Sequence, residues 1–348
     1  MSIRDARKFM SAGRPRSHKV GQPDGRELRT AMPPSPKTGR NAASRAEPTE
    51  RQRYPRLNPT LACDTAFRLV ARRRLADLIG NHDATCQGSA TALHQMRIAL
   101  TCLRTAISFF SPMVSDSKRT EITAELKWLH RHLGVVRDLD VAIERLEACN
   151  KQASRVSPDH RSWNGKRTES HRHLARALRS ARYRRLVKSI SGWIEGGPWS
   201  TRKGKLPAQQ RTSPIAAYSA RKLARWQEKL LKKSRKLEKM DTKKRHRLRL
   251  LNKKLCYSIE FLEDLYPDKR FSKQPVALKH LRKAQRSLGR LNDNANRQSL
   301  TAAMERDGVW ASLPFLSAKD EKRLMRTAAK AYRKLAALKS VSDLRRQA

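Results

Sequence analysis

Two stretches decide the fold class of this chain: LHQMRIALTCLRTAISFF at residues 93–110 and RHRLRLLNKKLCYSIEFL at residues 245–262. In each stretch apolar side chains recur every three or four residues, the spacing that places them on one face of an α-helix packed in a bundle. The apolar face consists of Leu93, Met96, Leu100, Leu103, Ile107 and Phe110 in the first stretch, and of Leu248, Leu251, Leu255, Ile259 and Leu262 in the second. Both stretches are therefore predicted to be helices that contribute one face to a core.

A basic stripe runs beside the apolar face of each helix. The stripe consists of His94, Arg97, Thr101 and Arg104 in the first helix, and of His246, Arg249 and Lys253, with Lys254 close by, in the second. A single basic stripe is typical of the solvated face of any helix in a basic protein. Its repetition favours two stripes that face one groove. The histidines are equally suited to a structural role, in which they orient a neighbouring backbone group or arginine.

Each of these helices is followed about 40 residues later by the pattern L-G-x-x-x-D, in LGVVRDLD from Leu133 and in LGRLNDNA from Leu288. Two short patterns in the same order and at similar spacing indicate an internal duplication. Helical periodicity extends from Leu61 onward, and few stretches alternate as strands do. The predicted fold is all-α, with two pseudo-symmetric antiparallel helical bundles flanking a basic groove or central cavity.

Loop-like segments near residues 111, 157, 196 and 266 divide the helical region and leave room for about seven to nine helices, with corners expected at the L-G positions. The stretch before this region is rich in Arg, Pro, Ser and Gly, a composition typical of a disordered basic arm. The predicted organisation is an arm at residues 1–57, a helical domain at 58–340 with halves at about 58–200 and 201–340, and a C-terminal tail at 341–348.

The charge of the chain predicts a polyanionic partner. Lys and Arg number 78 against 31 Asp and Glu, a formal net charge of +47 that opposes compaction unless it is neutralised. Nucleic acid, an anionic membrane surface and a phosphate polymer all satisfy this requirement. No apolar run approaches the roughly 18 residues of a membrane span, and the five cysteines are far apart. We therefore expect a soluble, cytoplasmic protein with reduced thiols and no membrane insertion.

Candidate catalytic and metal sites are weakly supported. The sequence contains no G-x-x-x-x-G-K-[ST] loop, G-x-S-x-G elbow or H-E-x-x-H pair. His130 with His132, and His171 with His173, are two residues apart and so point to different sides of a helix, which argues against metal ligation. The acids near the L-G corners suit helix caps or arginine partners better than an acid and base pair; they are Asp138, Asp140 and Asp293. We expect neither catalysis nor a cofactor.

The two H-x-x-R helices, together with LKWLHRHLGVVRDLDV at 126–141 and LARALRSARYRRLVKSISGW at 174–193, resemble the CHAD family over about residues 58–340. The resemblance implies two helical bundles related by a pseudo-two-fold, a basic cavity between them that binds inorganic polyphosphate, and an association with polyphosphate granules. The positions that match the family's binding residues are His94, Arg97, Arg104, Arg137, His246, Arg249, Lys253 and Lys254. Further basic contacts are suggested at Lys127, Arg131, Arg282, Lys283 and Arg286.

This chain departs from the family pattern at three positions, where Thr101, Cys102 and Cys256 stand in place of expected cations. The departure bears on affinity more than on fold.

Aromatic content favours polyphosphate over single-stranded nucleic acid. A phosphate polymer has no bases, so its site needs closely spaced Arg and Lys without stacking platforms. Aromatic residues make up only 5% of the chain, and a core role is expected for Trp128, Trp163, Trp193 and Trp226. Binding to the phosphates of DNA or RNA is the alternative, because it requires only charge.

Overall fold

The computed structural model describes residues 56–153, 159–265, 274–306 and 315–338. These residues form helices joined by turns, with an isolated β-bridge between Ala62 and Pro214. The prediction of an all-α fold is confirmed. The predicted arm and C-terminal tail lie outside the described residues, so the domain boundaries stay predictions. No helix in the described part of the chain is both long and apolar enough to cross a bilayer.

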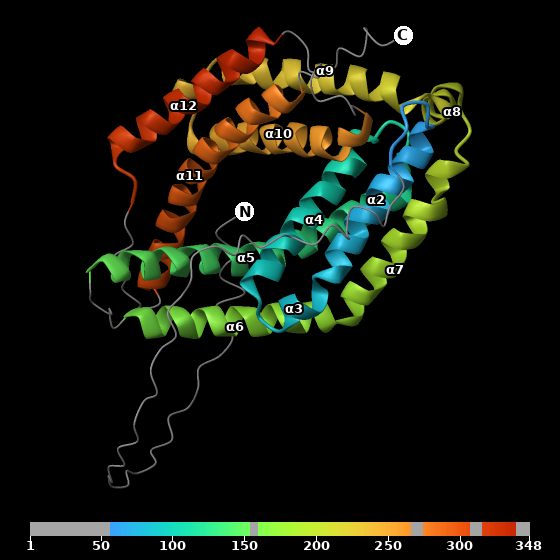
Figure 1. Ribbon diagram of the computed structural model, residues 1–348. Coiled ribbons are helices and arrows are strands. Elements are labelled where there is room, and N and C mark those ends of the chain that lie inside the picture. Colours follow the sequence, from blue (N-terminus) through green and yellow to red (C-terminus); the bar gives the residue numbers. More distant parts are fainter. Residues whose placement is uncertain (1–55, 154–158, 266–273, 307–314, 339–348) are drawn as a thin grey trace, which may run out of the picture. The chain divides into compact units, whose positions relative to one another are not determined.

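The first half consists of six α-helices and a short 3₁₀ helix (Figure 1). They are α2 (Cys63–Gly80), α3 (His82–Cys86), α4 (Ala90–Phe109), α5 (Ser117–Ala153), α6 (Asp159–Arg179), α7 (Ala181–Gly196) and η1 (Pro198–Ser200). Helix α4 packs against α2 and α5, and α5 packs in turn against α6 and α7. Gly88, with φ of +91°, permits the reversal between α3 and α4, and the Ser89 hydroxyl then caps α4 by accepting from the Ala92 amide.

The second half continues with α8 (Lys205–Thr212), α9 (Ile215–Ser234), η2 (Leu237–Lys239), α10 (Thr242–Phe261), η3 (Glu263–Leu265), α11 (Gln274–Arg306) and α12 (Ala318–Ala337). Helix α10 packs between α9 and α11, and α11 packs against α12. The described residues thus contain eleven α-helices, more than the seven to nine expected. The excess arises because α3 and α8 span only five and eight residues, too few to display a helical period.

The corners expected at the two L-G positions are wrong. Gly134 lies inside α5, which has 37 residues, and Gly289 lies inside α11, which has 33. A glycine costs a helix interior about 0.5–1 kcal/mol relative to alanine, a penalty that tertiary packing readily overrides. The acids that follow these glycines are consequently within helices and do not cap them.

Aromatic side chains join the two halves. The ring of Phe109, at the end of α4, makes edge contacts with Tyr218 and Trp226 of α9 and with Phe261 of α10, at centroid distances of 5.4–5.6 Å. The Tyr218 hydroxyl donates to the Phe109 carbonyl (2.6 Å), and Phe110 stacks on Tyr218. Such pairs are worth about 0.5–1.5 kcal/mol each beyond the area they bury. The halves therefore share one core.

The tryptophans are largely in the core, as expected. Trp128, Trp163 and Trp193 are buried, and Trp226 is partly buried against the main core. Trp163 belongs to a smaller apolar cluster with Leu139 of α5.

We predict that Asn252→Leu destabilises the fold. Asn252 is fully buried; its Nδ2 donates to the Leu281 carbonyl (3.1 Å), and its Oδ1 accepts from the Tyr332 hydroxyl (3.2 Å), so it connects α10 with α11 and α12. Leucine would remove the acceptor of the buried Tyr332 hydroxyl and the side-chain donor to the Leu281 carbonyl, which should lower the free energy of unfolding by about 2 kcal/mol. Urea denaturation measures the change. Tyr332→Phe, which removes one of the two bonds, should cost less, and a neutral Asn252→Leu would contradict this role.

Candidate functional site

Arg97 connects α4 to α5 beside the L-G pattern. Its Nη1 donates to the carbonyls of Leu133 (3.4 Å) and Gly134 (3.2 Å) and lies 3.7 Å from Asp138 Oδ1. Burial lowers the pKa of Arg97 and raises that of Asp138, and the attraction between the two partly offsets both shifts. Arg97 therefore uses some of its hydrogen-bond donors to hold α4 against α5.

The second half has a related connection between α10 and α11. His246 Nδ1 donates to Asn292 Oδ1 (2.6 Å), and the neighbouring Asp293 acts electrostatically on both Asp138 and Lys253. The sequence left His246 with either a binding role or a structural role. The contact with Asn292 is of the structural kind. The predicted pseudo-symmetry of the halves remains a prediction.

The two predicted stripes come together, because α4 contacts α10 and α5 contacts α11. The pKa of Lys253 is lowered to about 8, first by burial and then by the charges of Arg249 and Arg97, which belong to different halves. Arg104 and Lys254 are a second such pair, since Arg104 lowers the pKa of Lys254 after burial does. We call these residues the central cation cluster: Arg97, Arg104, Arg249, Lys253 and Lys254.

Helix α9 adds cations that the sequence stripes did not reveal. Lys254 Nζ donates to Ser108 Oγ (3.2 Å) and lies 5.9 Å from the centre of the Trp226 ring. Lys222 Nζ lies 5.8 Å from the same ring, and both Lys222 and Lys229 are electrostatically coupled to Lys254. The cluster thus extends along α9. Only the fold, which brings α9 beside α10, could have identified these two lysines.

Two histidines beside the cluster are held neutral. The pKa of His130 on α5 is lowered to about 4, first by burial and then by Arg104, Arg97 and Lys253. The pKa of His94 is also lowered, by burial and by Arg137, Arg97 and Lys253. Both can donate or accept hydrogen bonds at neutral pH without adding charge. His130 was not predicted as a site residue, because nothing in its sequence context shows that it faces α4 and α10.

Of the other predicted cations, Arg137 is electrostatically coupled to Arg97 of the cluster. Arg137 pairs with Glu144 (2.8 Å) near His94. Lys127 and Arg131 are exposed on α5 and lie on the same helix face as Asp138. On α11, exposed Arg282 and Arg286 lie on the same helix face as Asp293. Arg282 donates to Glu260 (2.9 Å), and exposed Lys283 lies about 100° around α11 from Arg282.

The positions without the expected cations are filled compactly. The Thr101 hydroxyl donates to the Arg97 carbonyl (2.8 Å), and Cys102 and Cys256 are buried, which raises the pKa of each thiol to about 12. The two cysteines lie in the interior and Thr101 is partly buried, and none of the three contributes charge to the cluster.

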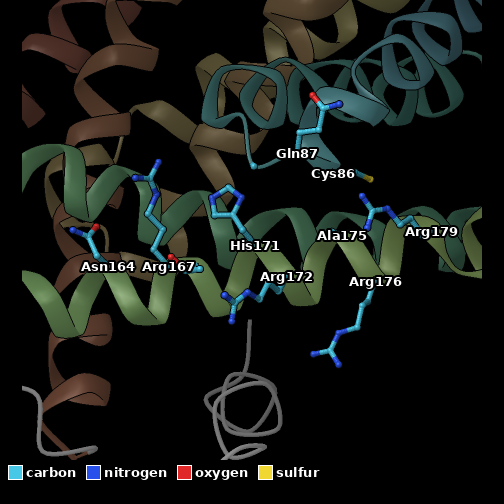
Figure 2. A pocket seen from close by; sticks show the side chains of 11 residues that line it. Cys86, Gln87, Asn164, Arg167, His171, Arg172, Ala175, Arg176 and Arg179 are labelled. Atoms are coloured by element: carbon cyan, nitrogen blue, oxygen red, sulfur yellow. The ribbon is translucent and has the colours of Figure 1, made fainter. Parts of the chain in front are cut away.

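Two of the three acids are arginine partners, as expected, but they occupy helix interiors. Asp138 faces Arg97, and the fully buried Asp140 accepts from Arg167 Nε (2.8 Å) and His171 Nε2 (2.9 Å) of α6. A cavity of about 820 Å³ lies beside this second group (Figure 2). The cations of the central cluster do not line that cavity, so the groove expected between the bundles stays a prediction.

Comparison with known proteins identifies the family. The model of the CHAD domain matches residues 69–302, more than half of the chain, and the chain belongs to this family. The resemblance drawn from the sequence is confirmed.

Two solved structures are similar in fold. A crystal structure of the CHAD domain from the plant Ricinus communis has a TM-score of 0.61 and 21% identity, covering 83% of this chain and 92% of that one. PptA from Streptomyces chartreusis has a TM-score of 0.50 and 14% identity, covering 80% and 97%. No curated protein matches.

The lowered pKa of Lys253 predicts a pH-dependent stability. Between pH 8 and 10.5 the unfolded chain keeps this proton while the folded protein releases it, so the contribution of Lys253 to stability improves as pH rises. Lys253→Met should therefore raise the free energy of unfolding at pH 7 by about 2 kcal/mol, a value discounted for partial exposure, and by less at pH 10. Urea denaturation at both pH values tests this. The exposed Lys243→Met on the same helix is the control, and equal effects of the two variants would contradict the shift.

Proposed function

We propose that this protein binds inorganic polyphosphate at the central cation cluster, without catalysing a reaction, and that binding associates it with polyphosphate granules. The observation that carries the proposal is the packing of α4 on α10, which holds Arg97 and Arg104 of one half near Arg249, Lys253 and Lys254 of the other. Membership of the CHAD family supports the same ligand class.

The electrostatics of the cluster favour a polymer of closely spaced anions. Burial and mutual repulsion make its cations costly in the free protein, as the pKa shifts of Lys253 and Lys254 show. A bound polyanion would offset both costs at once. Arginine offers paired donors to phosphate oxygens, and lysine offers a mobile point charge.

The tryptophans offer little for the bases of single-stranded nucleic acid. Trp128 is 8% exposed and Trp193 is 2% exposed, so neither presents a face on which a base could stack. Trp226 is already flanked by Phe109 and by the ammonium groups of Lys222 and Lys254. These positions suit a ligand that presents only phosphates.

We predict that Arg104→Gln with Lys254→Gln weakens polyphosphate binding about 10- to 100-fold, because two charge-assisted contacts are lost. These residues are chosen because Arg97 also holds backbone carbonyls of α5, so its loss would confound binding with folding. The assay displaces labelled long-chain polyphosphate from the full-length protein at near-physiological salt. Competitors are polyphosphate, single-stranded RNA and duplex DNA at matched phosphate concentration.

The matched control removes the same charge elsewhere, with Lys322→Gln and Arg326→Gln on the exposed face of α12. It should change affinity by less than about 2-fold, the contribution of net charge alone. If both double variants weaken binding equally, or if all three competitors displace alike, total charge governs binding and the nucleic-acid alternative is favoured.

Binding should also take up protons. A polyanion favours the charged form of Lys253, whose pKa of about 8 in the free protein would rise, so at pH 8 about half a proton should enter per site. Calorimetry in two buffers of different ionisation enthalpy measures the uptake with long-chain polyphosphate, whose interior phosphates do not titrate there. At pH 8 the uptake should vanish in Lys253→Met. Unchanged uptake in that variant would assign the proton to another group.

A further inference from the structure

Helix α5 presents acids to two different sides. Asp138 faces Arg97 and the central cation cluster, whereas Asp140, two residues later, faces Arg167 and His171 of α6. Residues two apart on a helix are separated by about 200° around its axis, so these groups cannot share one surface. The second basic group is therefore distinct from the central cluster.

A cavity of about 820 Å³ lies at this second group, between α6 and the turn after α3 (Figure 2). It is lined by Cys86, Gln87, Gly88, Asn164, Arg167, Thr168, His171, Arg172, Ala175, Arg176 and Arg179. Its described lining thus includes four arginines and a histidine but no acid. Figure 2 shows Arg167, His171 and Arg179 on the side of α6 that faces Cys86 and Gln87.

The buried carboxylate beneath the cavity organises its wall. Asp140 is fully buried; burial raises its pKa, but the hydrogen bonds from His171 and Arg167 outweigh that effect and lower it. Asp140 remains ionised at neutral pH and holds both side chains in place. Arg167 donates to Asp140 through Nε, so the two Nη groups of its guanidinium are not used in this hydrogen bond.

We propose that this cavity is a second anion site, which takes a phosphate-type oxyanion. Arginine donors suit phosphate oxygens, the amide of Gln87 and the hydroxyl of Thr168 can add neutral hydrogen bonds, and the cavity is open to solvent, so a charged ligand can reach these groups. The ligand is either a free small phosphate or a segment of a longer chain held at the central cluster.

Cys86 provides a reporter inside the site. It lines the cavity and is partly exposed, whereas Cys63, Cys102 and Cys256 are buried. In a full-length Cys149→Ser background, alkylation by the uncharged reagent N-ethylmaleimide reports on Cys86. The rate with ligand is compared with the rate of the same variant without ligand, because the pKa of this thiol is raised by burial and lowered by Arg179, so removal of Arg179 changes the starting rate. At 90% occupancy, tripolyphosphate should slow this alkylation about 10-fold, whereas sodium chloride at equal ionic strength should not.

The test variant is Arg172→Gln with Arg179→Gln, since both arginines are exposed and neither is bound to Asp140. It should raise the tripolyphosphate concentration needed for protection about 10-fold or more. Lys322→Gln with Arg326→Gln, of equal charge change on α12, should leave that concentration within about 2-fold. Absence of protection by both tripolyphosphate and long-chain polyphosphate, or protection that survives in the cavity variant, would overturn the proposal.

The central-cluster variant Arg104→Gln with Lys254→Gln distinguishes a free small phosphate from a segment of a longer chain. Protection by tripolyphosphate that persists in this variant supports a site for free small phosphates. Protection by long-chain polyphosphate alone, lost in both this and the cavity variant, supports a site for a segment of a chain anchored at the central cluster. Displacement of labelled polyphosphate from the cavity variant shows whether the central cluster still binds, so failure of one site is distinguishable from failure of the other.

Discussion

The aromatic contact between Phe109 and the side chains of α9 and α10 is the constraint on which the rest of the structure depends. Phe109 meets Tyr218, Trp226 and Phe261, and the Tyr218 hydroxyl closes the junction by binding the Phe109 carbonyl. Because Phe109 and Phe261 follow Arg97 and Arg249 at the same interval along their helices, joining the aromatic ends also brings the two arginines near one another. Packing energy thereby holds like charges together.

The cost of this arrangement is visible in particular side chains. Lys253 has its pKa lowered to about 8, and His130 is kept neutral with a pKa of about 4. Asp138 offsets part of the repulsion by its contact with Arg97, and Asp293 does so by its attraction to Lys253, but these two acids face five cations. A site that is strained in this way in the free protein gains most from a ligand that carries many negative charges, and gains little from a neutral one.

The sequence was sufficient to predict the helical fold, because a 3.6-residue period reports directly which side chains share a helix face. The meeting of the two stripes was predicted from their repetition in both halves. The sequence failed where the deciding information was long-range or where a local signal was overridden. Gly134 and Gly289 suggested corners, yet α5 and α11 continue through them. Lys222 of α9 and His130 of α5 join the cluster only through packing, and the cavity depends on Asp140 meeting α6.

The departures from the family pattern make sense if the two halves act as one surface. When Arg97 is aligned with Arg249, Thr101 of the first helix aligns with Lys253 of the second. In the same alignment Cys102 aligns with Lys254. Conversely, Cys256 corresponds to Arg104. Each half therefore supplies cations at the positions where the other has none. Since the electrostatic coupling of Arg104 with Lys254 already crosses between the halves, a full set on both helices would add repulsion to a cluster in which Lys253 is already hard to protonate.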